Sequence, residues 1–263
     1  MHMADALISP AVGGAMIAVS GASLAWSIRK DRGHPPDDRK IPLMGVMSAF
    51  VFAAQMVNFT IPGTGSSGHI GGGILLAALL GGGPALLCIT AVLAIQCLLF
   101  ADGGLLALGC NLFNMGVVPC LVAYPLIYRP IAGNGGNRRR LTVASVAAAV
   151  AGLQLGALAV VGQTTLSGIS HLPIGAFLML MQPIHLAIGV AEGLITAAVL
   201  LYVGRARPEL LKASHERRPL PAGAPLKRVL VALAALTLVV GGGLSLLASS
   251  HPDGLEWSIG GAL

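Results

Sequence analysis

The sequence predicts an all-α protein, a polytopic bundle of about eight transmembrane helices, and two observations support this. Of the 263 residues, 55% are hydrophobic and 10% are charged, and the mean hydropathy is +0.83. A soluble domain carries roughly 25% charged residues, so this chain has too little polar surface to face water. The apolar runs also approach about 20 residues, whereas a strand of a membrane barrel needs only about 10.

The apolar runs define the expected spans, which lie at 9–28, 41–60, 70–83, 84–101, 105–128, 141–161, 174–203 and 229–248. The run Gly81-Gly82-Gly83-Pro84 separates the third span from the fourth, because glycines end one helix and proline opens the next. The third span is too short to cross a full hydrocarbon core. We therefore expect it inside the bundle, beside a loop that dips into the membrane.

The positive charges are confined to a few connections between the spans. All 16 Lys and Arg residues lie within 29–40, 129–140 and 205–228. Cytoplasmic connections carry the excess of Lys and Arg, so these three are expected in the cytoplasm and the N-terminus on the outer side. The net charge of +6 then reflects membrane orientation, and we expect lipid rather than nucleic acid around the protein.

The first residues lack the basic region and cleavage site of a signal peptide, so Met1 is expected to remain as the mature N-terminus. The bulky His2 also disfavours removal of Met1. The cysteines have no CxxC spacing, which predicts buried thiols rather than a metal or redox site, at Cys88, Cys97, Cys110 and Cys120.

His2 is the most specific candidate for chemistry. A free terminal amine followed by histidine can bind a metal through the amine, the deprotonated amide of His2 and its imidazole Nδ1. Three coplanar nitrogens leave one position open in the plane, and such tetragonal coordination suits Ni(II), Cu(II) or low-spin Co(II). The alternative is that His2 is an ordinary residue of a frayed terminus.

His69 is the candidate for the fourth nitrogen, because it lies on the same outer side as His2. It ends a Gly/Ser loop, 62–69, whose glycines allow tight folding and close approach to a ligand. The alternative is an exposed loop histidine. His185 and Glu192 lie on one face of the seventh span, where they could support a site, handle protons or lock helices together.

These residues belong to motifs that resemble the CbiM/NikM family, the substrate-binding membrane components of energy-coupling-factor (ECF) transporters for cobalt and nickel. The resemblance covers residues 1–205. It rests on five segments in the right order, Met1–Pro10, Ser67–Gly72, Phe100–Gly104, Asn111–Gly116 and His185–Gly193.

The resemblance implies a near-planar site of four nitrogens from Met1, His2 and His69. It also implies supporting contacts to that site from Asp102, Asn111, Asn114, His185 and Glu192. The cargo would be Ni2+ or Co2+, imported for nickel enzymes or cobalamin biosynthesis, with no prosthetic group.

The same resemblance implies a transporter component in the inner (plasma) membrane rather than an enzyme. Its partners would be a transmembrane coupling (T) component and two ATP-binding subunits. The absence of a GxxxxGK[ST] phosphate loop agrees with ATP hydrolysis on separate subunits. The choice between nickel and cobalt stays open, since both accept the same nitrogens.

After a basic cytoplasmic linker at 206–228, residues 229–263 add one further span and an outer segment. Residues 251–257 resemble the PDGLE element of NikN/CbiN-like auxiliary subunits, which here would act in cis. That element usually carries a second span, and this chain stops at Leu263. The segment is therefore either a shortened version or a truncated one.

A competing hypothesis is an intramembrane metalloenzyme that uses His69, His171, His185 and Glu192. Insertion of a residue between Met1 and His2 separates the two hypotheses, because only the terminal chelate would lose its metal. A passive channel is a third possibility, but too few polar residues lie in the spans to line a pore.

Overall fold

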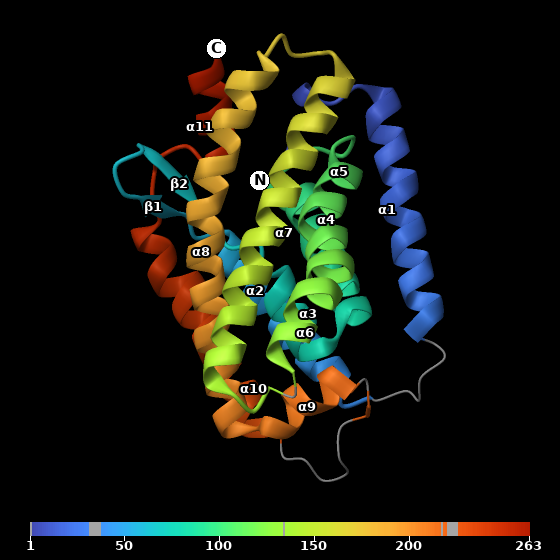
Figure 1. The fold of residues 1–263 in the computed structure, drawn as a ribbon, viewed down its shortest axis with the longest axis vertical. Coiled ribbons are helices and arrows are strands. Elements are labelled where there is room, and N and C mark those ends of the chain that lie inside the picture. The colour runs from blue at the N-terminus through green and yellow to red at the C-terminus, as the bar shows by residue number, and fades with distance from the viewer. Residues whose placement is uncertain (1, 32–37, 134, 217, 220–225) are drawn as a thin grey trace.

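The computed structural model describes residues 2–31, 38–133, 135–216, 218–219 and 226–263, which form a helical bundle (Figure 1). Six helical stretches among these residues are long and apolar enough to cross a membrane. They are 10–31, 82–100, 108–132, 138–167, 174–206 and 227–247. The prediction of a polytopic α-helical membrane protein is confirmed, although the described residues contain six full-length spans where about eight were expected.

Two of the expected spans are shorter than predicted. Helix α2 (Lys40–Gln55) ends five residues before the apolar run does, and α3 (Gly73–Leu80) has eight residues, all buried. Because α3 is enclosed by other helices, it needs no membrane-spanning length. Between them the expected loop is instead a hairpin of β1 (Phe59–Ile61) and β2 (Ser66–Gly68), paired antiparallel.

The turn of this hairpin depends on glycine. Gly63 and Gly65 have φ angles of 78° and 71°, a left-handed conformation that residues with a Cβ rarely adopt. Ile61 pairs with Ser66 beside the turn, and Phe59 pairs with Gly68 at the open end. The register therefore delivers His69, the next residue, to the interior of the bundle.

Helix α1 (Pro10–Asp31) lies at the side of the bundle, and α4 (Gly82–Phe100) packs against α1, α2 and α3 (Figure 1). The next span is continuous from α5 (Leu108–Leu112) through η2 (Phe113–Tyr128) to α6 (Arg129–Ala132). Its middle section has the wider π-helical hydrogen-bond pattern and contains Pro119 and Pro125. Each proline lacks an N–H and would break a regular α-helix, so the widened turns accommodate both.

Helices α7 (Arg138–Ser167) and α8 (Ile174–Ala206) pack against each other along their length. Gly189 and Gly193 of α8 make this close approach possible. A Cβ on Gly189 would lie 2.9 Å from the Cα of Val150, and one on Gly193 would lie 2.5 Å from the Cα of Val146. Small residues spaced four apart are the usual device for close helix packing in membranes.

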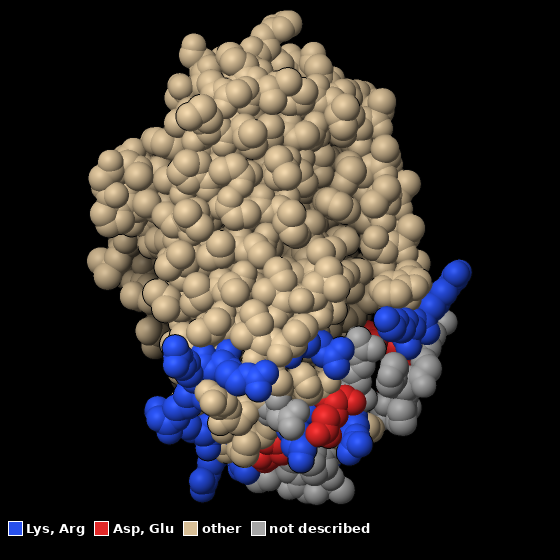
Figure 2. Space-filling model, in the orientation of Figure 1, with Lys and Arg blue, Asp and Glu red and all other residues tan. Residues whose placement is uncertain are grey.

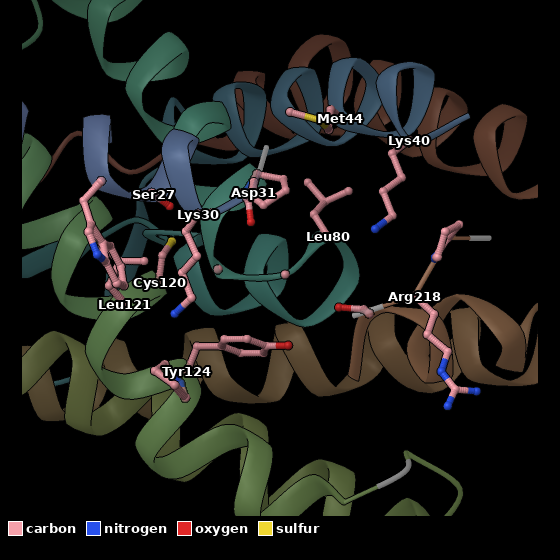
Figure 3. A pocket seen from close by; sticks show the side chains of 18 of the residues that line it. Ser27, Lys30, Asp31, Lys40, Met44, Leu80, Cys120, Leu121, Tyr124 and Arg218 are labelled. Atoms are coloured by element: carbon pink, nitrogen blue, oxygen red, sulfur yellow. The ribbon is translucent and has the colours of Figure 1, made fainter. Parts of the chain in front are cut away.

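The Lys and Arg residues gather at one end of the molecule (Figure 2). Helix α9 (Pro208–Glu216) lies at this end within the predicted linker, where Leu210 and Leu211 are buried and the helix packs against α3 and α8. A hollow of about 310 Å³ also opens here, lined by Lys30 and Lys40 among others (Figure 3).

The C-terminal part adds one helical path that runs away from the basic end. It begins as α10 (Lys227–Leu238), continues through η3 (Val239–Gly243) and η4 (Leu244–Leu247), and packs on α2. The last helix, α11 (Gly254–Ala262), then packs against α8 and β2 in the opposite half of the molecule (Figure 1). Asp253 caps α11 by accepting hydrogen bonds from the N–H groups of Leu255 and Glu256.

Candidate metal centre

The N-terminal segment, including the short helix η1 (Asp5–Leu7), is fixed in the bundle by backbone and side-chain hydrogen bonds. The Met3 N–H donates to Asn111 Oδ1 at 2.7 Å, and Asn111 Nδ2 donates back to the Met3 carbonyl at 3.1 Å. Gly104 also donates to the Met3 carbonyl, and the N–H of Ala107 donates to Asp5 Oδ1 at 2.9 Å. Met3 is fully buried, so the segment is a packed part of the protein.

His2 and His69 lie next to each other in the interior. Their ring centroids are 5.1 Å apart and their planes differ by 26°. With metal–nitrogen bonds of about 2 Å, two imidazoles on adjacent corners of a square place their centroids roughly 4.5 Å apart, and opposite corners place them more than about 6 Å apart. The observed spacing fits adjacent corners, as a terminal chelate completed by a second histidine requires.

Met1, which would supply the amine, lies outside the described residues. Burial lowers the pKa of both His2 and His69, and that of His69 lies well below its ordinary value. Both imidazoles therefore favour the neutral form, the form that binds a metal.

A chain of side-chain amides sets the tautomer of His2. Gln55 donates to the Gly71 carbonyl at 2.7 Å, and Gln96 donates to Gln55 Oε1 at 2.8 Å. Gln96 Oε1 therefore faces His2 Nε2, at 3.2 Å, as an acceptor. The His2 proton then resides on Nε2 and the lone pair on Nδ1, which is the nitrogen that a terminal chelate uses.

Gln96 was missed among the predicted site residues. The signal for it was present in the sequence, since an amide in the apolar run 84–101 is costly in lipid and indicates a function or a partner.

His69 is held through its neighbours. Its Nδ1 lies 3.2 Å from the Ile70 carbonyl, so the proton is on Nδ1 and the lone pair on Nε2. The Glu192 carboxylate accepts hydrogen bonds from the N–H groups of Gly71 at 2.7 Å and Gly72 at 3.0 Å. The sequence left three roles open for Glu192, and its contacts in the structure are those of a residue that anchors the His69 loop.

Asp102 and Asn114, also predicted to support the site, lie beside the N-terminal segment. Asp102 Oδ1 is 3.6 Å from His2 Nδ1, too long for a hydrogen bond but close enough for an ion pair when His2 is protonated. Asn114 and Gln163 exchange hydrogen bonds at 2.9 and 3.0 Å, and Asn114 also contacts the Met3 sulfur at 3.7 Å.

His185 is fully buried on α8 and lines a small cavity that His69 also lines. His171, by contrast, is exposed in the connection between α7 and α8. Among the described residues, no group of three or more His, Cys, Asp or Glu side chains is placed to hold a metal. The set of side chains that the enzyme hypothesis requires is therefore not assembled.

The C-terminal segment contacts the strand that leads to His69. The Ser67 N–H donates to the Pro252 carbonyl at 2.8 Å, and the Ser67 hydroxyl donates to the His251 carbonyl at 2.7 Å. Asp253 then lines the same small cavity as His69 and His185. The sequence placed both segments on the outer side but did not predict that they touch.

Comparison with known proteins agrees with this architecture. Residues 2–210 match the CbiM family, described as a cobalt uptake substrate-specific transmembrane region, and residues 227–262 match the PDGLE domain. A relative from Haloquadratum walsbyi, whose name assigns it to metal transport, is 38% identical over 82% of this chain and 95% of its own.

A relative from Archaeoglobus fulgidus, whose name assigns it as the fused nickel transport protein NikMN, is 35% identical over 91% of this chain and 75% of its own. The crystal structure of a transition metal transporter is 31% identical, with a TM-score of 0.69, and matches 83% of this chain and 100% of its own.

These relatives are transport proteins, so the intramembrane metalloenzyme hypothesis is wrong. This multi-pass membrane protein is a nickel or cobalt transport component and belongs to the CbiM family, with a PDGLE domain joined to it in the same chain.

Proposed function

We propose that this chain captures Ni2+ or Co2+ in a plane of four nitrogens. These are the Met1 amine, the deprotonated amide and Nδ1 of His2, and Nε2 of His69. The observation that carries the proposal is the buried pair of imidazoles at 5.1 Å, with hydrogen bonds that direct the lone pairs to Nδ1 of His2 and Nε2 of His69. A square of nitrogens suits Ni(II) and low-spin Co(II), and it disfavours Zn(II), which prefers tetrahedral coordination.

The surrounding residues hold the ligands in position rather than bind the ion. Gln96 sets the His2 tautomer, Glu192 anchors the loop of His69, and Asn111 clamps the backbone beside His2. Such outer contacts typically tune metal affinity by about 10–100-fold. The relative named NikMN supports nickel as cargo, and the family description supports cobalt.

The chain acts as the substrate-specificity component of an ECF importer in the inner (plasma) membrane. The basic end faces the cytoplasm by the positive-inside rule, so the opposite end of the molecule faces the outer side, from which the metal is taken up. A coupling component and two ATP-binding subunits supply the energy, and the hollow beside Lys30 and Lys40 offers them a surface (Figure 3).

The chain divides by function into a capture domain at 1–205, a linker at 206–228 and an auxiliary segment at 229–263. The auxiliary segment does in cis what a separate NikN/CbiN-like subunit would do. The hydrogen bonds between Ser67 and residues 251–252 support this, since they join the segment to the strand that carries His69.

The test uses the full-length protein purified with an unmodified N-terminus. Insertion of an alanine between Met1 and His2 should abolish stoichiometric Ni2+ and Co2+ binding, measured by elemental analysis after gel filtration. The same insertion after Gly136, exposed at the basic end, is the matched control and should leave binding unchanged. Retention of full metal content by the N-terminal insertion variant would contradict the proposal.

A further inference from the structure

The hollow of about 310 Å³ at the basic end collects positive charge from two consecutive helices. Lys30 lies in the last turn of α1, and Lys40 is the first residue of α2. Figure 3 shows both side chains extending toward the same space. Neither ammonium group forms an ion pair with any residue that the structure describes. Two like charges that face one space repel each other, so the arrangement favours an anion between them.

The other charged groups of the wall do not neutralise the two lysines. A Cβ on Gly83 would collide with the Asp31 carboxylate, so this carboxylate lies against the first turn of α4, at the positive end of the helix dipole. Arg218 adds another cation, and its guanidinium lies 3.4 Å from the Glu216 carboxylate. The positive end of the α2 dipole also lies at Lys40. The hollow is therefore positive overall.

Trp26 and Ile41 extend the hollow onto apolar surface. Both residues line it, and they are 54% and 64% exposed. Lys30 Nζ lies 4.5 Å from the centroid of the Trp26 ring, a cation–π contact. Tryptophan near the end of a membrane span, with lysine beside it, is typical of the membrane–water interface. The hollow thus lies at the level where a phospholipid headgroup meets its acyl chains.

Ser214 of α9 adds a polar group that the described protein leaves unsatisfied. The residue lines the hollow and is buried, and its hydroxyl has no hydrogen-bond partner among the described residues. A buried hydroxyl of this kind carries a free-energy cost and calls for an explanation. Because a hydroxyl hydrogen can rotate, it can donate to an acceptor oxygen that enters the hollow.

We propose that this hollow binds the phosphate of an anionic phospholipid, held by the ammonium groups of Lys30 and Lys40. Its acyl chains would run along the apolar surface of Trp26 and Ile41. Ammonium groups form strong, charge-assisted hydrogen bonds to phosphate oxygens, and basic pockets between membrane helices are typical sites for anionic headgroups. Phosphatidylcholine has the same phosphate, but its quaternary ammonium group would add one more cation to a positive space.

The proposal concerns the chain by itself in a bilayer and does not rest on metal capture. The coupling subunits proposed to dock at this end would meet a surface that includes the lipid. A lipid bound in this way also joins α1 to α2, because each helix supplies one of the two lysines.

The experiment follows the fluorescence of Trp26 in the full-length protein, reconstituted in phosphatidylcholine vesicles. The chain has two tryptophans, and the other, Trp257, lies on α11 in the opposite half of the molecule (Figure 1). Trp257→Phe therefore leaves Trp26 as the only emitter. Phosphatidylglycerol or phosphatidylcholine with brominated acyl chains is then titrated, because bromine quenches tryptophan on contact. We expect the brominated phosphatidylglycerol to bind beside Trp26 about fivefold more tightly, or better.

The double variant Lys30→Gln/Lys40→Gln should lose this preference. Arg138→Gln/Lys212→Gln is the matched control, since it removes the same charge from a different hollow at the basic end and should keep the preference. Excess inorganic phosphate at constant ionic strength should not displace the lipid, because free phosphate gains nothing from the apolar walls. Circular dichroism and gel filtration establish that each variant is folded.

Equal quenching by the two brominated lipids in the unmodified hollow would overturn the proposal. An equal loss of preference in both double variants would also overturn it, because the lipid would then respond to the charge of the whole basic end. Displacement by inorganic phosphate would assign the hollow to a free anion instead of a lipid.

Discussion

Glu192 on α8 accepts a hydrogen bond of 2.7 Å from the N–H of Gly71, two residues after His69. Its other oxygen accepts from Gly72, so one carboxylate holds two consecutive backbone donors in a buried position. The position of the His69 ring thus depends on a side chain more than 100 residues away in sequence, on a different helix.

Glu192→Gln should therefore weaken metal binding and destabilise the protein. The glutamine oxygen can accept one of the two N–H groups, but its amide group would face the other, and an unsatisfied buried donor costs about 1–3 kcal/mol. We expect metal affinity to fall by roughly tenfold, measured by competition with a chelator, and Tm to fall in the metal-free protein. Glu209→Gln, at the basic end, is the control, and an equal effect there would contradict this role.

Replacement of Gln96 and of Gln55, the two side chains of the hydrogen-bond chain that ends at His2, should lower metal affinity by different amounts. Gln96→Leu removes the acceptor of the His2 Nε2–H, so the proton can shift to Nδ1 and compete with the metal, at a cost of about tenfold or more. Gln55→Leu should cost less, because Gln55 acts on His2 only through Gln96. Isothermal titration of Ni2+ measures both variants. A larger loss for Gln55→Leu than for Gln96→Leu would show that the order of the chain is wrong.

Asn111→Leu should release the N-terminal segment without unfolding the bundle. The substitution removes both hydrogen bonds to Met3 and leaves its buried N–H without a partner. Hydrogen exchange should rise at the backbone amides of residues 2–7, with α7 and α8 unchanged, and metal binding should weaken. Asn58→Leu, outside the segment, provides the comparison, and unchanged exchange at Met3 in Asn111→Leu would refute the clamp.

The metal-free protein should lose stability as the pH falls. Burial lowers the pKa of His2 and His69 in the folded state, whereas both are near 6.5 in the unfolded chain. Below about pH 6.5 the unfolded chain takes up protons that the folded protein does not, so stability falls as the pH drops.

Thermal unfolding in detergent between about pH 8 and pH 5 measures this dependence. The double variant His2→Asn/His69→Asn should show a shallower loss of Tm, and the exposed His171→Asn should follow the unmodified protein. An identical slope in the double variant would assign the pH dependence to other groups.

The sequence pattern was most informative about charged and polar groups, because such a group inside a bilayer carries a large free-energy cost and its position is therefore meaningful. The confinement of Lys and Arg to three connections predicted a single basic end, which the structure has (Figure 2). His2, His69, Asn111 and Glu192 were all predicted as site residues. The structure places His2 beside His69, Asn111 against the N-terminal segment and Glu192 on the loop that follows His69.

Other features depend on contacts between distant segments, which the local pattern does not contain. The sequence of α3 resembles part of a membrane span because its residues are all apolar. The helix can be as short as eight residues because other helices enclose it, and the sequence pattern does not show that enclosure. The hairpin at 59–68 has a Gly/Ser sequence with little strand preference, and Ser66 and Ser67 are stabilised by the backbone of residues 251–252.

The hydrogen bond from Ser67 to Pro252 joins two parts of one chain, the CbiM-family region and the PDGLE domain. Because they share a chain, docking is intramolecular, with an effective concentration on the order of millimolar. A contact too weak to hold two separate subunits together at cellular abundance would then still be occupied most of the time. The fused chain also fixes the ratio of the two parts at one to one, whatever the level of expression.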